Sequence, residues 1–178
     1  AKNDNVMIVV APTGGNIFTP EVLQVITELT KQAWQTPYSS RVDSVSNFQH
    51  TEAVEDDLLV ADLVKEPAGL NDAELERIRV IATSEPLLAN RLVATDGNST
   101  AVNILLQIPL EVESEGTVEV AKFVRELAAK TEAAHPNIKI YLAGMVMMNN
   151  AFAEASINDM TTLIPLSFGV MVVLLVLL

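Results

Sequence analysis

The sequence contains no cysteine, which excludes disulfide bonds, thiolate metal sites and cysteine nucleophiles together. Basic residues are scarce, because 11 lysines and arginines stand against 23 aspartates and glutamates, for a formal net charge of −12. A nucleic-acid-binding surface needs a concentration of Lys and Arg, so we expect no nucleic-acid partner. The two histidines, His50 and His135, lie far apart along the chain. Nothing predicts a catalytic triad, a metal centre or a cofactor site, and we expect no enzyme.

Charge is absent from the C-terminal end of the sequence. All charged side chains lie at or before Asp159, and residues 160–178 are dominated by Leu, Val, Ile, Phe and Met. Helical residues rise about 1.5 Å each, so this run spans roughly 28 Å, close to the hydrocarbon thickness of a bilayer. The run predicts a transmembrane helix that continues beyond Leu178. The alternative is a buried helix of a soluble core, which seldom extends this far without a charge.

The residues that flank the charge-free run predict its orientation. The last basic residue is Lys139, whereas Glu154 and Asp159 lie near the start of the run. Cytoplasmic flanks of membrane helices are usually enriched in Lys and Arg. We therefore expect residues 1–159 to lie on the extracytoplasmic, or periplasmic, side of the inner (plasma) membrane.

The spacing of apolar residues before this run alternates between strand and helix patterns. Strands are predicted at residues 6–11, 41–48, 92–95, 100–110 and 137–143. Helices are predicted from an N-cap at Thr19, from a capping box at Asn71 and Glu74, and from Thr117 to His135. An Asp96-Gly97 turn is expected to join two of the strands as a hairpin.

The order of these elements predicts an α+β domain. Strand, helix, strand, insertion, strand, helix, strand is the split β-α-β, ferredoxin-like arrangement, interrupted between its second and third strands. Right-handed crossovers place both helices on one face of an antiparallel sheet. We divide the chain into a porter-like domain at residues 1–143, a junction helix at 144–159 and a truncated transmembrane helix at 160–178.

The junction helix carries the candidate functional residues. Met145, Met148 and Phe152 recur at helical spacing and predict an adaptable lining for the path of an apolar substrate. The alternative is that this face packs against its own sheet or against a domain outside this sequence. A copper(I) site at Met145, Met147 and Met148 is a further alternative, although these side chains spread around a helix. We expect residues 143–178 to be nearly continuous helix.

One acidic cluster has residue types that can bind a metal ion. Glu55, Asp56 and Asp57 could hold Ca²⁺ loosely, but they lack the ligand spacing of a calcium loop. The interpretation that fits better is a solvated turn.

Three segments, in their order and spacing, resemble the first large extracytoplasmic loop of resistance–nodulation–division (RND) superfamily exporters. They are SNFQHTEAVEDDLLVADLV at residues 46–64, SEPLLANRLVATDGNSTAVNILLQI at residues 84–108, and the stretch from AGMVMMNNAF to the end at residues 143–178. Glu85 stands where many members have Asp. The branch that the chain resembles is the MMPL-like group of exporters of hydrophobic molecules or lipids.

The resemblance implies a function and partners. Family members have two such loops and are driven by ion gradients through acidic residues in later membrane helices. The implied partners are the rest of the membrane domain, the second extracytoplasmic loop, the lipid bilayer and a hydrophobic or lipid-like substrate. The sequence leaves open whether a second copy joins them in a homo-oligomer. The competing hypothesis is a membrane-anchored extracytoplasmic sensing or scaffold domain that binds a protein partner without transport.

Overall fold

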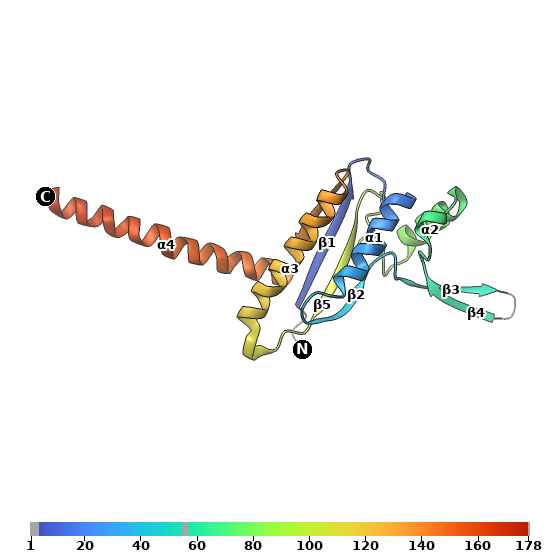
Figure 1. Cartoon of the computed structure of the whole chain (residues 1–178), viewed down its shortest axis with the longest axis horizontal. Coiled ribbons are helices and arrows are strands. Elements are labelled where there is room, and N and C mark those ends of the chain that lie inside the picture. Colours follow the sequence, from blue (N-terminus) through green and yellow to red (C-terminus); the bar gives the residue numbers. More distant parts are fainter. Residues whose placement is uncertain (1–3, 55–56, 178) are drawn as a thin grey trace.

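The computed structural model of this chain describes residues 4–54 and 57–177, and its centre is a four-stranded antiparallel sheet (Figure 1). The strands, in the spatial order β2-β5-β1-β6, are β1 (Asp4–Pro12), β2 (Ser39–Asp43), β5 (Thr100–Leu106) and β6 (Ile138–Ala143). Helix α1 (Pro20–Ala33) connects β1 to β2, and helix α3 (Glu113–Ala134) connects β5 to β6. The predicted α+β class with a split β-α-β order is confirmed.

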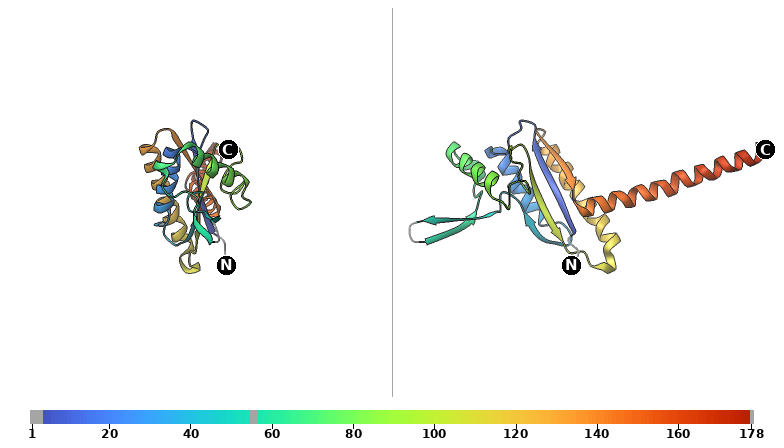
Figure 2. Two further views of the ribbon diagram at one scale, coloured as in Figure 1. Left: turned by 90° about the vertical axis from the view of Figure 1, so that its right-hand side faces the viewer. Right: turned by 180° about the vertical axis from the view of Figure 1, so that it is seen from behind.

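Both crossover helices cover the same face of the sheet (Figure 2). Val6, Ile8 and Val10 point to that face from the central strand and are completely buried. They meet buried residues of the two helices, among them Leu23 of α1 and Val124 of α3. Burial of a Val or Ile side chain stabilises the fold by about 1.5–3 kcal/mol, so this inward row fixes the register of β1.

Two helix starts form as the sequence predicts. The Thr19 hydroxyl accepts the Val22 backbone N–H, which caps α1. Asn71 and Glu74 form the reciprocal capping box of α2 (Asp72–Ser84). Both caps depend on residues three positions apart, so local sequence is enough to specify them.

The insertion between β2 and β5 is confirmed and projects from the sheet (Figures 1 and 2). It contains β3 (Gln49–Val54) and β4 (Asp57–Asp62), which pair with each other in a separate two-stranded sheet, followed by the short η1 (Pro67–Gly69) and by α2. The acidic turn predicted at Glu55, Asp56 and Asp57 includes two residues, Glu55 and Asp56, that lie outside the described residues.

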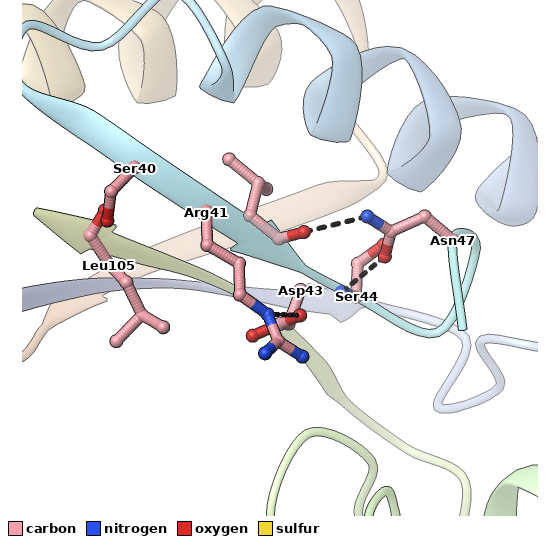
Figure 3. Close-up of polar contacts among 7 residues, drawn as sticks. Ser40, Arg41, Asp43, Ser44, Asn47 and Leu105 are labelled. Carbon is pink, nitrogen blue, oxygen red and sulfur yellow. Dashed lines mark hydrogen bonds and ion pairs between the residues drawn. The ribbon is translucent and has the colours of Figure 1, made fainter. Parts of the chain in front are cut away.

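The strand predicted at 41–48 is wrong in its second half, because β2 ends at Asp43. The side chain of Asn47 explains this end (Figure 3). Its Oδ1 accepts the Ser44 N–H at 2.8 Å and its Nδ2 donates to the Val42 carbonyl at 2.7 Å. One side chain thus takes backbone groups that a neighbouring strand would otherwise bind, and the chain turns.

The predicted hairpin around Asp96 and Gly97 is only partly formed. The turn exists, with Gly97 at φ +73° and the Asp96 carboxylate accepting the Asn98 N–H. The strand predicted at 92–95 is wrong, because only isolated bridges through Val93 occur there. The preceding residues coil tightly, with Asn90 at φ +59°, so they do not continue as an extended ladder.

Helix α3 begins at Glu113, four residues before the predicted start at Thr117. The short helical turn η2 (Leu110–Val112) leads into it directly. Glu113 and Glu115 lie in its first turn, where the partial positive charge of a helix N-terminus favours carboxylates. Acidic residues at the N-terminus therefore favour a start earlier than Thr117.

The last element is one long helix, α4 (Met145–Leu177), and the predicted continuity is confirmed over these 33 residues. Its most apolar window has a mean hydropathy of 2.4 and no residue buried, so it is long and apolar enough to cross a membrane. At about 1.5 Å per residue the helix extends roughly 50 Å, well beyond a hydrocarbon core of about 30 Å. Pro165 lies inside the helix rather than in a first turn.

Candidate functional site

The connection from β6 to α4 turns tightly at Gly144. Its φ is +105°, and a Cβ added there would lie 2.6 Å from the Asn5 carbonyl oxygen and 3.0 Å from the Val6 Cα. A side chain at this position would therefore collide with the backbone of β1. Glycine lets the long helix begin directly against the central strand.

Polar and apolar contacts both attach the first turns of α4 to the domain. The Met145 N–H donates to Asn5 Oδ1 at 3.2 Å, so a residue of β1 caps α4 across the fold. Asn5 Nδ2 in turn donates to Asn103 Oδ1 on β5 at 3.0 Å. Val146 and Asn150 are buried, at 1% and 2% exposure. We call these contacts, together with Gly144, the junction.

An ion pair extends the junction to α3. Arg125 donates from Nη1 to Glu154 Oε1 at 2.7 Å and from Nη2 to Glu154 Oε2 at 3.0 Å, and Asn150 Nδ2 also reaches Glu154 Oε1 at 2.8 Å. Glu154 lies outside the charge-free run that starts at Met160. The hydrogen bonds from Arg125 and then from Asn150 lower the pKa of Glu154 to about 2. The bidentate geometry fixes the angle between the two helices better than a single contact would.

The predicted substrate-path residues lie on the side of α4 that faces away from the domain. Met145, Met148 and Phe152 are exposed to 44%, 48% and 66%. Residues at such spacing share one side of a helix, and Val146 and Asn150 bury the other side. The alternative in which these three side chains pack against their own sheet is therefore wrong. Their role as a substrate path stays a prediction.

The methionines do not converge as a copper site would require. Met147 packs partly buried against the hydrophobic core, whereas Met145 and Met148 point outward. Among the described residues, 4–54 and 57–177, no group of three His, Cys, Asp or Glu side chains could hold a metal ion.

A cleft of about 910 Å³ extends across β1, β5 and the edge strand β2, and the sequence did not indicate it. We call it the edge cleft. Its apolar lining comes from residues of several segments: Met7, Trp34, Phe48, Leu87, Leu88 and Leu92. Its polar lining includes Arg41, Asp43, Asn47, Arg91 and Asn103. Because these residues are far apart along the chain, between β1 and β5, no local sequence motif predicts the cleft.

Arg41 and Asp43 form the charged part of the edge cleft on β2 (Figure 3). Arg41 Nε donates to Asp43 Oδ1 at 2.7 Å, and neither Nη atom makes a hydrogen bond or ion pair with the described residues. The neighbouring Ser40 hydroxyl donates to the Leu105 carbonyl at 3.0 Å, which ties this edge to β5. The guanidinium of Arg41 thus keeps donors that can point at a ligand.

A second hollow, of about 810 Å³, lies where the start of α1 meets the end of α3. Glu21, Glu28 and His135 are among its lining residues. Glu21 and Glu28 are its acidic lining residues, and the other lining residues are apolar or uncharged polar ones apart from His135.

A ferredoxin-like domain that continues without a break into a helix long enough to cross a bilayer defines a membrane-associated α+β protein. The MMPL family model matches residues 1–178, and the chain belongs to the MMPL family. The predicted resemblance to the MMPL-like branch of RND exporters is thereby confirmed, and membership supports a membrane-embedded transporter of the RND kind. A search of curated proteins found no match.

Proposed function

We propose that residues 1–159 form the periplasmic domain of an exporter that moves hydrophobic or amphiphilic, lipid-like molecules out of the inner membrane. Family membership supports the transporter class. In this proposal residues 1–143 are the porter-like domain, 144–159 the junction helix and 160–178 the membrane helix. An ion gradient drives export through helices that this sequence does not include.

The observation that carries the substrate class is the outward apolar face of α4. Met145, Met148 and Phe152 remain exposed although apolar side chains normally gain by burial. The same side of the helix carries Leu163, Leu166 and Val170 about five turns further along. Two apolar stretches on one side of the helix, one beside the domain and one in the charge-free run, offer a hydrophobic molecule contact at both ends of its exit. Asp159 interrupts this face near the start of the charge-free run.

The junction supplies the mechanical part of the proposal. Gly144, the Asn5 cap and the Arg125–Glu154 pair attach α4 to the sheet and to α3. A helix held at its first turns by several independent contacts moves with its domain rather than about a hinge. Movement of the membrane helix would therefore move the periplasmic domain, which export requires and a passive anchor does not.

The expected partners follow from the outward face and from the family. The proposed neighbours are the rest of the membrane domain, the second extracytoplasmic loop, the bilayer and a second copy of the chain. Any of the protein partners could cover part of Met145, Met148 and Phe152 without filling the path.

Photo-crosslinking in the full-length transporter tests the proposal. A benzophenone amino acid replaces Phe152 in cells, and a matched variant carries it in place of Glu126, which is exposed on α3. We expect adducts with small apolar molecules, detected by mass spectrometry, at position 152 and not at position 126. Adducts at 152 with polypeptide alone would contradict the substrate path and would favour the sensing or scaffold hypothesis.

A further inference from the structure

The edge cleft combines a large apolar surface with a local excess of positive charge. Arg41, Arg91 and Asp43 are the charged residues in its lining, in a chain whose net charge is −12. A cleft with two guanidinium groups and one carboxylate is therefore an exception to the acidic character of the chain. Guanidinium groups bind carboxylates, phosphates and sulfates through directed pairs of N–H donors.

We infer that the edge cleft binds an amphiphile with an anionic head group, its apolar chain against Trp34, Phe48 and Leu87 and its head group between Arg41 and Arg91. The volume of about 910 Å³ lies within the range of small-molecule sites. This inference rests on the proposed export function for the general substrate class, and it adds the charge of the head group and a second place of binding.

The polar side chains of the cleft are available for such a ligand. Arg41 uses Nε for Asp43, so its Nη donors remain for an oxyanion (Figure 3). Arg91 is exposed and has no carboxylate within ion-pair distance among the described residues. Asn90, which precedes it, holds a positive φ of +59°, and the Asn90 N–H donates to the Val93 carbonyl at 2.9 Å. This folded turn, rather than a free loop, presents Arg91 to the cleft.

The cleft shares residues with the junction, although its charged residues on β2 lie across the sheet from α4. β2 and β6 are opposite edges of the sheet, and α4 follows β6. The cleft also reaches Asn5 and Asn103, which are hydrogen-bonded to each other, and Asn5 caps α4. A ligand that displaces the Asn103 contact would act on the residue that holds the first turn of the membrane helix. The amphiphile would therefore be recognised at a site from which the domain can respond.

Trp34 is the only tryptophan of the sequence, lines the cleft and is 50% exposed, so its fluorescence reports binding directly. The whole 178-residue chain is placed in nanodiscs of zwitterionic lipid and titrated with an ω-bromo fatty carboxylate, because bromine quenches tryptophan on contact. The alcohol and the trimethylammonium compound of equal chain length serve as neutral and cationic probes. Brominated lipid in the nanodisc itself measures any quenching from the bilayer.

We expect saturable quenching by the carboxylate, with an affinity about fivefold or more above that of the alcohol and with no saturation by the cationic compound. Arg41→Gln and Arg91→Gln should each weaken carboxylate binding several-fold and leave alcohol binding unchanged. Lys139→Gln, which removes the same charge on the opposite edge strand, should change neither.

Equal affinities for the three head groups, or equal losses in all three variants, would overturn the inference. Full displacement of the probe by inorganic phosphate at similar concentration would overturn it too, since it would show a simple anion site. None of these outcomes bears on crosslinking at Phe152, so the inference and the proposed function can fail separately.

Discussion

Gly144 lets α4 begin directly against the backbone of β1. Its φ of +105° and the 2.6 Å approach of an added Cβ to the Asn5 carbonyl leave no room for alanine without a backbone shift. We predict that Gly144→Ala lowers the free energy of unfolding by about 1–3 kcal/mol, measured by urea denaturation of the whole chain in nanodiscs.

Gly14 is the matched control for this substitution. A Cβ there meets nothing within 4 Å, and its φ is not positive. Gly14→Ala should change the free energy of unfolding by less than about 0.5 kcal/mol. Equal effects of the two substitutions would mean that Gly144 is not under the steric constraint described above.

The role of a single residue could be predicted from the sequence where its hydrogen-bond partner is close along the chain. The caps by Thr19 and Asn71 each involve a residue three positions away, so their chemistry could be read locally. Asn5 caps α4 through Met145, which is 140 residues away in sequence. No local pattern connects these two, and the relation exists only because β1 and β6 are neighbours in the sheet.

The contact between α3 and α4 fixes how these two helices are oriented to each other. The Arg125–Glu154 pair is half exposed, so its effect on global stability is small. Its two parallel hydrogen bonds instead fix orientation. We predict that Arg125→Glu increases hydrogen exchange in residues 146–152, measured by mass spectrometry, and that adding Glu154→Arg in the same chain restores protection.

The pH dependence of this protection follows from the lowered pKa of Glu154. A carboxyl whose folded-state pKa is depressed contributes stability above its ordinary pKa of 4.5 and loses that contribution as the pH falls toward about 2. Protection of residues 146–152, corrected for intrinsic exchange, should therefore be equal at pH 7 and pH 5. A loss of protection between these values, or a charge reversal that restores nothing, would show that the pair does not hold the helices together.

Helices were easier to predict than strands. The apolar spacing of α1 and the cap of α2 were sufficient, and only the start of α3 was placed too late. The two strand errors, at 41–48 and 92–95, both arise where side chains or coiled backbone take over hydrogen bonds that a ladder would use. Whether a strand continues depends on its neighbour, which the sequence does not display.

At the scale of the whole molecule, the order of elements was enough to predict the topology. A split β-α-β order with short right-handed connections leaves few arrangements, and the observed β2-β5-β1-β6 order is the expected one. The edge cleft could not be predicted, because its lining is assembled from distant segments by the tertiary fold. The outward position of Met148 and Phe152 also required the structure, since helical spacing identifies a face but not its direction.

In the proposed export mechanism the folded domain and α4 move as one rigid body. The domain's buried residues end at Asn150, and every described residue of α4 beyond it is exposed. Rigidity across the membrane edge must therefore come from the helix backbone itself and from the junction. Pro165 removes one backbone donor within this helix and is the position where bending would concentrate.

A distance measurement across the junction tests this claim most directly. The chain has no cysteine, so Lys130→Cys on α3 and Thr162→Cys on α4, which precedes Pro165, provide the only two labelling sites for nitroxides. Pulsed electron paramagnetic resonance in nanodiscs should give one narrow distance distribution, and a short glycine insertion after Asp159 should broaden it. A distribution that is already broad without the insertion would contradict the rigid connection and, with it, the mechanical role of α4.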